Sequence, residues 1–388
     1  MAPSLSAREI LNTLVAFPTV SRDRNLDLVD WVESYLADHG VRAHRVLSDC
    51  GTKASLFANV GPDRAGGVVL SGHSDVVPVD GQAWNTDPWT VTERDGRLYG
   101  RGTCDMKGFD ALALAAVPLA LERGVRRPLQ IALSHDEELG CTGAPPMIDR
   151  MREVLPPAAT AIIGEPSMMK VVTAHKGGTG FHTRVVGHEV HSSIMHKGVS
   201  AVMEAARLVD WANRMNEANR ARPVPEQAAD FDPPWTTVHV GRISGGTAGN
   251  ITAGECRFGL DFRVVPGDIL EDWMAAYRAE VARVEAAMQS VHPDARIELT
   301  PYFHVPALMP ETDGAAERIV RALTGDNGLH VVSYGTEAGQ FQERGYSAVV
   351  CGPGDIAQAH QPNEYLTVDQ FRAGERFIHR LVDTLCKE

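Results

Sequence analysis

Ser71-Gly72-His73-Ser74-Asp75-Val76-Val77-Pro78 follows directly on an apolar run at residues 67–70. We expect a buried strand that ends in a histidine, with an aspartate two residues further on. A histidine at a strand end can bind a metal ion through one ring nitrogen while its other N–H meets a carboxylate or a carbonyl. The same pattern also fits a purely structural histidine, so other segments have to decide between the two.

Acidic residues follow other apolar runs in the same way. Residues 129–134 lead into His135-Asp136-Glu137-Glu138, residues 161–164 lead into Glu165, and Asp105 precedes an Ala/Leu-rich helix. Strands that alternate with helices indicate an α/β domain with a mixed, mostly parallel sheet, in which ligands bind beyond the carboxyl ends of the strands. Each acid alone also fits a solvated loop or a helix cap, but several at successive strand ends favour one site.

The middle of the chain predicts a second, smaller domain. Its expected order is β-α-β-β-α-β, which is the ferredoxin-like arrangement. We therefore expect one domain at 1–178 and 302–388, interrupted by a ferredoxin-like α+β domain at 179–301. Residues 84–101 contain turn residues and aromatic residues and are expected to form a loop.

Composition limits the function classes. A chain of 388 residues is long enough for two domains, and its net charge of -13 disfavours nucleic acid or an anionic membrane as a partner. We find neither a run of about eighteen apolar residues nor a signal peptide, so we expect a cytoplasmic protein. The six cysteines form no CxxC pair and are expected to be reduced thiols.

Two histidines and three carboxylates are the candidate metal ligands: His73, Asp105, Glu138, Glu165 and His360. Mixed nitrogen and oxygen ligands suit zinc, cobalt or manganese. With one carboxylate bridging, such a set makes a two-metal site that can deprotonate a water molecule and polarise a carbonyl group. Because Glu137 and Glu138 are adjacent, one can bind metal while the other acts as general base. A solvated loop histidine at 360 and an acidic helix N-terminus at 136–138 remain alternatives.

Several longer motifs resemble the M20 family of di-metal amidohydrolases and peptidases. They are GHSDVVP at 72–78, YGRGTCDMKG at 99–108, DEELG at 136–140, IIGEPS at 162–167, HSS at 191–193 and GPGDIAQAHQPNEY at 352–365. The resemblance implies that His73 and Glu165 hold one metal and that Glu138 and His360 hold the other. It further implies that Asp105 bridges the metals, that Asp75 orients His73, and that Glu137 is the catalytic base.

The resemblance also implies that residues 1–178 and 302–388 form the catalytic domain and that residues 179–301 form a lid and dimerisation domain, and it assigns residues there. His191 would stabilise the oxyanion, either after lid closure or from a dimer partner, and Asn250 would contact substrate. Arg263 would bind a substrate carboxylate, for which a planar guanidinium is well suited. A histidine in a surface turn and an arginine on an exposed strand are the alternative interpretations for His191 and Arg263.

Residues 174–177, which include Lys176, and residues 334–338, which include Glu337, are similar to the acetylornithine deacetylase branch of the family. The expected reaction is hydrolysis of N2-acetyl-L-ornithine to L-ornithine and acetate, as in arginine biosynthesis. It would need two divalent metal ions, for which zinc is the expected metal and cobalt or manganese are the alternatives. It would take place in a homodimer. Another N-acyl-amino-acid amidohydrolase or a dipeptidase is the alternative enzyme, and an amino-acid-binding protein on an inactive scaffold is the alternative from another class.

Overall fold

The computed structural model describes residues 5–387 and divides the chain into two compact units. The second unit comprises His175–Ala307 and Val332–Gly335, and it interrupts the first unit in sequence. These boundaries differ by a few residues from the expected 178/179 and 301/302. The reason is strand length, because the paired strands β9 (Gly177–Val186) and β12 (Arg296–Val305) carry the second unit's sheet past the expected ends.

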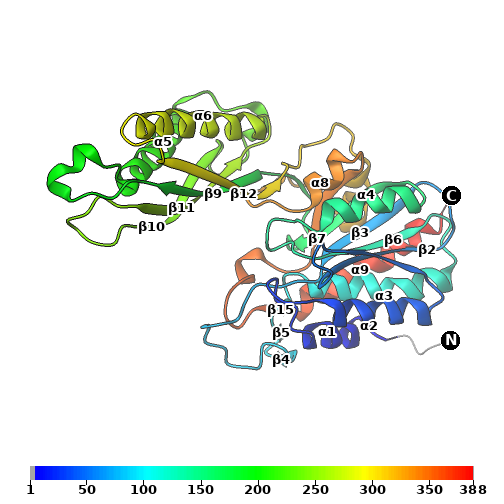
Figure 1. Ribbon diagram of the computed structural model, residues 1–388. Helices are drawn as coiled ribbons and strands as arrows, with labels where there is room; N and C mark the ends of the chain where they lie inside the picture. The colour runs from blue at the N-terminus through cyan, green and yellow to red at the C-terminus, as the bar shows by residue number, and fades with distance from the viewer. Residues whose placement is uncertain (1–4, 388) are drawn as a thin grey trace. The chain divides into compact units, whose positions relative to one another are not determined.

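An eight-stranded mixed sheet organises the first unit, in the order β1-β2-β6-β3-β7-β14-β8-β13 (Figure 1). Its middle strands β6, β3, β7 and β14 pair in parallel, while β1 and β2 continue one side in antiparallel fashion. Every residue of β3 and β6 is buried, as expected for strands covered on both faces. The bounds are β1 Ala43–Leu47, β2 Ala54–Val60, β3 Gly67–His73, β6 Leu129–Ser134, β7 Ala158–Pro166, β8 Val172–His175, β13 His330–Val332 and β14 Ser347–Gly352.

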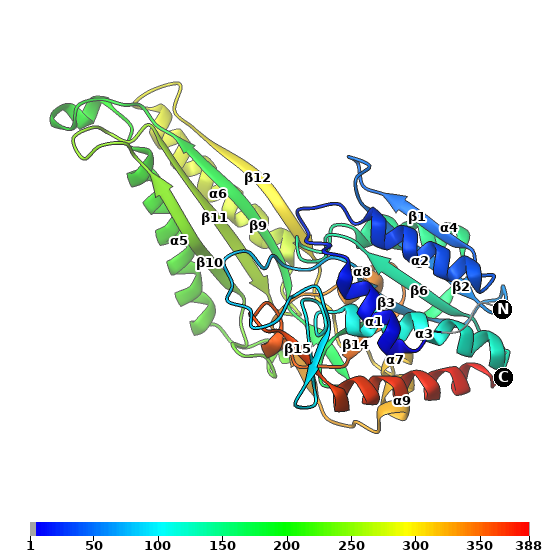
Figure 2. The same cartoon turned by 90° about the horizontal axis from the view of Figure 1, so that it is seen from below.

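Helices cover both faces of this sheet (Figures 1 and 2). A capping box of Ser6 and Glu9 begins α1, and Gly124, in the left-handed region, ends α3. Helix α3 packs against α1, α9 and strand β3. The segment before α3 lies at the carboxyl end of β3, where Asp105 meets His73. The helices are α1 Ala7–Ala16, α2 Leu26–Asp38, α3 Lys107–Arg123, α4 Ala144–Val154, α7 Ala315–Thr324, α8 Ala338–Glu343 and α9 Val368–Leu385, with the short 3-10 helix η3 at Ile356–Gln358.

The expected loop at residues 84–101 contains a hairpin, so this part of the prediction was wrong. Strands β4 (Thr92–Arg94) and β5 (Arg97–Tyr99) are joined by Asp95-Gly96, both with positive φ. An Asp-Gly pair favours such a two-residue turn. Strand β5 then pairs with β15 (Tyr365–Thr367), which brings the end of the GPGDIAQAHQPNEY motif beside residues 97–99.

The second unit is a four-stranded antiparallel sheet in the order β10-β11-β9-β12, with α5 and α6 packed on its core. Following the chain, the order is β9-α5-β10-β11-α6-β12. The predicted fold class, an α/β domain with an inserted ferredoxin-like domain, is therefore confirmed. The remaining bounds are β10 Thr237–Gly245, β11 Glu255–Val264, α5 Ala201–Ala221 and α6 Leu270–Gln289, with 3-10 helices η1 at Ser192–Lys197 and η2 at Glu226–Ala228.

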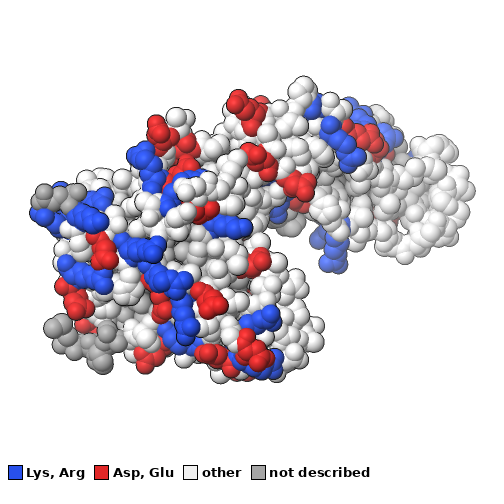
Figure 3. Space-filling view, turned by 180° about the vertical axis from the view of Figure 1, so that it is seen from behind, with Lys and Arg blue, Asp and Glu red and all other residues white. Residues whose placement is uncertain are grey.

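Within residues 5–387, no helix is both long enough and apolar enough to cross a bilayer. Figure 3 shows one face of the molecule, on which basic and acidic side chains are interspersed. On this face, positively and negatively charged side chains are therefore mixed, although the whole chain has a net charge of -13.

Candidate metal centre

His73, the last residue of β3, is fully buried. Its Nδ1 lies 2.9 Å from the main-chain carbonyl oxygen of Asp75. Since a carbonyl can only accept, Nδ1 carries the proton in the neutral ring, and the lone pair is on Nε2. Nε2 faces Oδ1 of Asp105 at 3.1 Å. The end of β3 thus directs the unprotonated ring nitrogen toward a carboxylate.

The carboxylate of Asp75 holds a different part of the site. It accepts a hydrogen bond from Oγ of Ser21 at 2.6 Å and from the amide nitrogens of Glu137 and Glu138 at 3.1 and 3.3 Å. Its Oδ1 lies 3.7 Å from Nδ1 of His73. The hydrogen bond that orients the ring is therefore the one that Nδ1 donates to the main-chain carbonyl oxygen of Asp75. Asp75 thereby joins the end of β3 to the turn after β6.

Asp105 lies between two histidines that are far apart in the chain. Its Oδ1 is 3.1 Å from Nε2 of His73, and its Oδ2 is 3.2 Å from Nε2 of His360. The residue is 5% exposed and stands just before α3. A carboxylate whose two oxygens face two imidazoles has the arrangement required of a ligand that bridges two metal ions.

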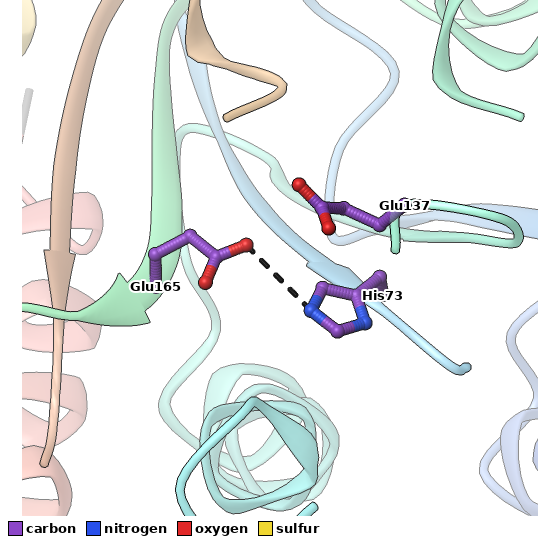
Figure 4. Close-up of side chains that lie close together, drawn as sticks. All are labelled: His73, Glu137 and Glu165. Atoms are coloured by element: carbon purple, nitrogen blue, oxygen red, sulfur yellow. Dashed lines mark ion pairs between the residues drawn. The ribbon is translucent and has the colours of Figure 1, made fainter. Parts of the chain in front are cut away.

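Glu165, near the end of β7, faces the same ring nitrogen of His73 as Asp105 does. Its Oε1 is 3.6 Å from Nε2 of that ring. Figure 4 shows the carboxylates of Glu165 and Glu137 directed toward the space beside the imidazole. Donor atoms of these three residues lie within 4.8 Å of one another. Three segments, the ends of β3 and β7 and the turn after β6, therefore converge on one point.

Glu138 and His360 form the more open side of the site. Oε2 of Glu138 is 3.0 Å from Nε2 of His360, whose side chain is 51% exposed. The neighbouring Glu137 faces elsewhere, and its Oε1 accepts a hydrogen bond from the Cys141 thiol at 3.1 Å. The two adjacent glutamates thus have different partners.

Several carboxyl groups are buried close together at this point. Burial raises the pKa of Glu137 to about 8 and that of Glu138 to about 7, with nearby carboxylates adding to the effect and His73 opposing it. Burial, followed by the charges of Asp105 and Glu137, raises the pKa of Glu165 well above its usual value. Burial alone would raise the pKa of Asp105 as well, but its close contacts with His360 and His73 hold that pKa below its usual value.

Divalent metal ions fit this set of donors. Two overlapping groups, His73 with Glu137 and Glu165, and His73 with Asp105 and Glu138, each bring their donor atoms within 4.8 Å. Imidazole and carboxylate ligands suit zinc, cobalt and manganese. Bound cations would also offset the repulsion among the buried carboxylates.

Glu337 and Lys176, two of the four predicted substrate-binding residues, are both 1% exposed. The Glu337 carboxylate accepts hydrogen bonds from Oγ of Ser71, at 3.0 Å, and from Oγ of Ser134. Nζ of Lys176, in the second unit, donates to the carbonyl oxygens of Pro233 and Trp235 at 2.7 and 3.3 Å. Because internal partners engage both groups, their contact with substrate stays a prediction.

His191 and Asn250 lie side by side in the second unit. The Ser192 amide nitrogen donates to the carbonyl oxygen of Asn250 at 2.9 Å, and His191 forms an isolated bridge with Ile251. Both His191 and Asn250 are exposed. Nδ1 of His191 accepts a hydrogen bond from the Ser193 amide at 3.2 Å. In the neutral ring the proton is therefore on the other nitrogen, Nε2.

Arg263 lies at the other end of the same sheet. Strand β11 pairs Glu255 with Val186 at one end and Arg263 with Gly178 at the other. A strand advances about 3.3 Å per residue, so the two ends of β11 are about 30 Å apart. His191 and Asn250 lie in the loops beyond the end where Val186 pairs with Glu255. Arg263, with its side chain 45% exposed, stands at the opposite end.

The sequence interpretation missed buried residues that support the predicted ligands. Ser21 holds Asp75, while Arg101 and Glu364, each 1% exposed, form an ion pair beside the Asp105 backbone. Arg101 and Glu364 stand within the quoted motifs, but their spacing in the sequence does not indicate that they meet.

This chain is similar to known proteins over most of its length. The family model described as Peptidase family M20/M25/M40 matches residues 69–384. An acetylornithine deacetylase from Myxococcus xanthus is 37% identical, with 100% of this chain and 99% of that protein covered. Another from Pasteurella multocida is 31% identical, with 97% of each chain covered.

Solved structures share the fold at lower sequence identity. An M20 family metallo-carboxypeptidase from Sulfolobus solfataricus has a TM-score of 0.78 at 16% identity, covering 98% of this chain and 99% of its own. A dinuclear metal-binding M20 peptidase from Bacillus subtilis has a TM-score of 0.64 at 14% identity, covering 98% and 97%. With a family model that spans most of its length and relatives that match it nearly end to end, this chain belongs to the M20/M25/M40 peptidase family.

Proposed function

We propose that this metal-dependent amidohydrolase removes the acetyl group from an N-acetylated amino acid, and that N2-acetyl-L-ornithine is its substrate. The observation that carries the proposal is the Asp105 carboxylate, with one oxygen 3.1 Å from His73 and the other 3.2 Å from His360. The relatives at 31% and 37% identity are acetylornithine deacetylases, which supports the choice of substrate. The products would be L-ornithine and acetate.

We assign two divalent ions to the site, with zinc first and cobalt or manganese as alternatives. His73 and Glu165 would hold one ion, Glu138 and His360 would hold the other, and Asp105 would contact both. When bound, the ions would polarise the acyl carbonyl and lower the pKa of a water molecule.

Glu137 is the proposed general base. Its carboxylate would take a proton from the attacking water and deliver it to the departing amine, a role typically worth about 10²- to 10⁴-fold in rate. The turn that carries Glu137 is held by the Asp75 carboxylate through the amides of Glu137 and Glu138. Asp75 therefore positions the base as well as the end of β3.

Arg263 is the proposed partner of the substrate's α-carboxylate, because its exposed guanidinium can make a bidentate contact. Asn250 would contact substrate at the other end of the second unit's sheet. Lys176 and Glu337 remain proposed contributors to ornithine selectivity, and Glu337 would act on the side-chain ammonium.

A homodimer explains how one small substrate meets groups from both ends of this sheet. His191 lies beyond one end of β11 and Arg263 stands at the other end, and the strand between them is about 30 Å long. An acetylated amino acid is far shorter, so the two residues would act on one substrate molecule only if they come from different copies of the chain. We propose that His191, with Asn250, reaches the site of a partner and donates a hydrogen bond to the oxyanion.

Mixing two inactive variants tests this arrangement. In a mixed dimer of His191→Ala and Glu137→Gln chains, action across the dimer gives one site with both residues intact, so activity should return after the subunits exchange. Action within one chain leaves both sites defective, and activity that does not return after proven exchange would contradict the dimer proposal.

A dipeptidase is the alternative enzyme, since the family includes peptidases. Rates on N2-acetyl-L-ornithine, other N-acylated amino acids and dipeptides, with zinc or cobalt supplied, separate the two activities. Cleavage of dipeptides without release of acetate from N2-acetyl-L-ornithine would refute the proposed substrate.

The six free cysteines suit the reducing cytoplasm, which we propose as the compartment.

A further inference from the structure

The Glu364 carboxylate accepts four hydrogen bonds from one short segment. Its Oε1 accepts from the amides of Cys104 at 2.8 Å and Asp105 at 3.0 Å. Its Oε2 accepts from the Gly102 amide at 3.0 Å and from Nη1 of Arg101 at 2.6 Å. Because this carboxylate is 1% exposed and fully engaged, it fixes the backbone on which Asp105 stands.

The Arg101 guanidinium extends this network to two other segments. Nη2 donates to Oε1 of Gln82 at 2.6 Å and approaches the carbonyl oxygen of Pro78 at 3.4 Å. Nη1 approaches the carbonyl oxygen of Gln361 at 3.4 Å, in addition to its bond with Glu364. One buried cation therefore links the loop after β3, the segment before α3 and the loop after β14.

Gln82 completes the connection to His360. Its Nε2 donates to the His360 carbonyl oxygen at 3.0 Å, and its Oε1 also accepts from Nε1 of Trp84 at 3.1 Å. His360 has a φ of 62°, a left-handed conformation that is uncommon for a residue with a side chain. The carbonyl groups of both His360 and Gln361 are thus held in place by this network.

We propose that Glu364 and Arg101 form a buried positioning pair that places Asp105 and His360, and so sets the affinity of the second metal position, the one assigned to Glu138 and His360. The inference rests on the two-metal centre proposed above. Neither side chain contacts a ligand side chain, so both act through the backbone that carries the ligands.

The two metal positions differ in how their ligands are supported. His73 pairs with Ser134 in the parallel β3–β6 ladder, and Glu165 stands next to Pro166, which pairs with Gly352 in the parallel β14–β7 ladder. Asp105 and His360 stand on segments between regular elements. A ligand on a loop depends on surrounding hydrogen bonds for its geometry. Loss of the positioning pair should therefore weaken the second position much more than the first.

Glu364→Gln is the primary test variant. The NH₂ group of glutamine can only donate, so wherever it lies, two of the four hydrogen bonds that the carboxylate accepts are lost. Metal-free protein would be titrated with Co²⁺ and followed by calorimetry and by visible absorption. Wild-type protein should bind two equivalents. The variant should bind the first with little change and the second about 10- to 100-fold more weakly.

Glu311→Gln is the matched control. Glu311 is also a carboxylate that accepts a backbone amide, from Ala348 at 3.1 Å, but it contacts Ser347 and Gln342 instead of the metal ligands. Both Co²⁺ affinities of this variant should equal those of wild type. Thermal unfolding of each metal-free variant shows whether it is folded.

Arg101→Lys serves if Glu364→Gln does not fold. Lysine keeps a positive charge for Glu364, but one ammonium group cannot also bond Gln82 and reach the Gln361 carbonyl. Selective weakening of the second equivalent in a folded variant supports the proposal. Unchanged binding of both equivalents overturns it, and so does equal weakening of both. If wild type itself binds fewer than two equivalents, the two-metal centre fails, and the positioning role fails with it.

Discussion

Nε2 of His360 lies 3.2 Å from Oδ2 of Asp105, although the histidine follows β14 and the aspartate precedes α3. The contact exists because β5 pairs with β15, which brings the loop after β14 beside the segment before α3. The other oxygen of Asp105 faces His73 at the end of β3. Asp105 is therefore the residue through which the two sides of the site meet.

Asp105→Asn should reduce metal binding at both positions. The amide is isosteric with the carboxylate, but its NH₂ group cannot act as a metal ligand, so the bridging contact is lost. We expect activity to fall by at least about 100-fold, in line with losses seen when metal ligation is disturbed. Elemental analysis of bound zinc, with Glu311→Gln as the control, checks this. Two tightly bound equivalents in the Asp105→Asn variant would rule out the bridging role.

Glu137→Gln should keep its metal and lose its turnover. The amide preserves the shape of the side chain but cannot take a proton from water, so kcat should fall by about 10²- to 10⁴-fold. Metal content and kcat would be measured on the same preparation. Turnover close to that of wild type would show that another group is the base.

Arg263→Met should raise KM with little change in kcat. The guanidinium is proposed to bind a carboxylate that does not react, and losing a charge-assisted pair costs about 1.5–3 kcal/mol, or roughly 10- to 150-fold. Arg257→Met is the control, because Arg257 lies on the same strand and the same face and is bonded to Glu255. An equal effect of both substitutions would indicate general electrostatics in place of a specific contact.

Cys104→Ser should leave activity largely intact. The thiol is 2% exposed, and its Sγ lies 3.4 Å from the carbonyl oxygen of Asp355, a contact that a serine hydroxyl can also make. Burial, together with the charges of Glu364 and Asp105, raises the pKa of this thiol, so it is not a reactive thiolate. Loss of most activity in a variant with normal metal content would show that the cysteine has a chemical role.

Tyr277→Phe should destabilise the second unit. The Tyr277 hydroxyl is fully buried and lies 2.7 Å from Oγ1 of Thr183, which would lose its partner. Leaving a buried hydroxyl unpaired costs about 1–3 kcal/mol in the free energy of unfolding. Urea denaturation measures this cost, and Tyr302→Phe, at a tyrosine that is 38% exposed, is the control. Equal stabilities of the two variants would contradict the assigned contact.

The convergence of His73, Glu138 and Glu165 was predictable because each follows an apolar strand. An apolar run followed by a polar residue marks the ends of β3, β6 and β7, and parallel strands place their carboxyl ends together. The second unit was predictable for a similar reason, since its alternating strands and amphipathic helices occur in a recognisable order.

The supporting contacts were not predictable from such patterns. Arg101 meets Glu364 only because the hairpin at Asp95-Gly96 pairs β5 with β15, a contact between distant parts of the chain. Ser21 reaches Asp75 in the same way, across more than fifty residues of sequence. Local periodicity specifies an element and its buried face, but it does not specify which distant loop will lie beside it.

Release of acetate from N2-acetyl-L-ornithine, measured as metal-free protein is reloaded with zinc, tests the central claim most directly. We predict that the metal-free protein is inactive and that acetate and L-ornithine form in equal amounts once up to two equivalents of zinc are bound. Full activity without metal, or no release of acetate by the protein carrying two equivalents of zinc, would contradict this account.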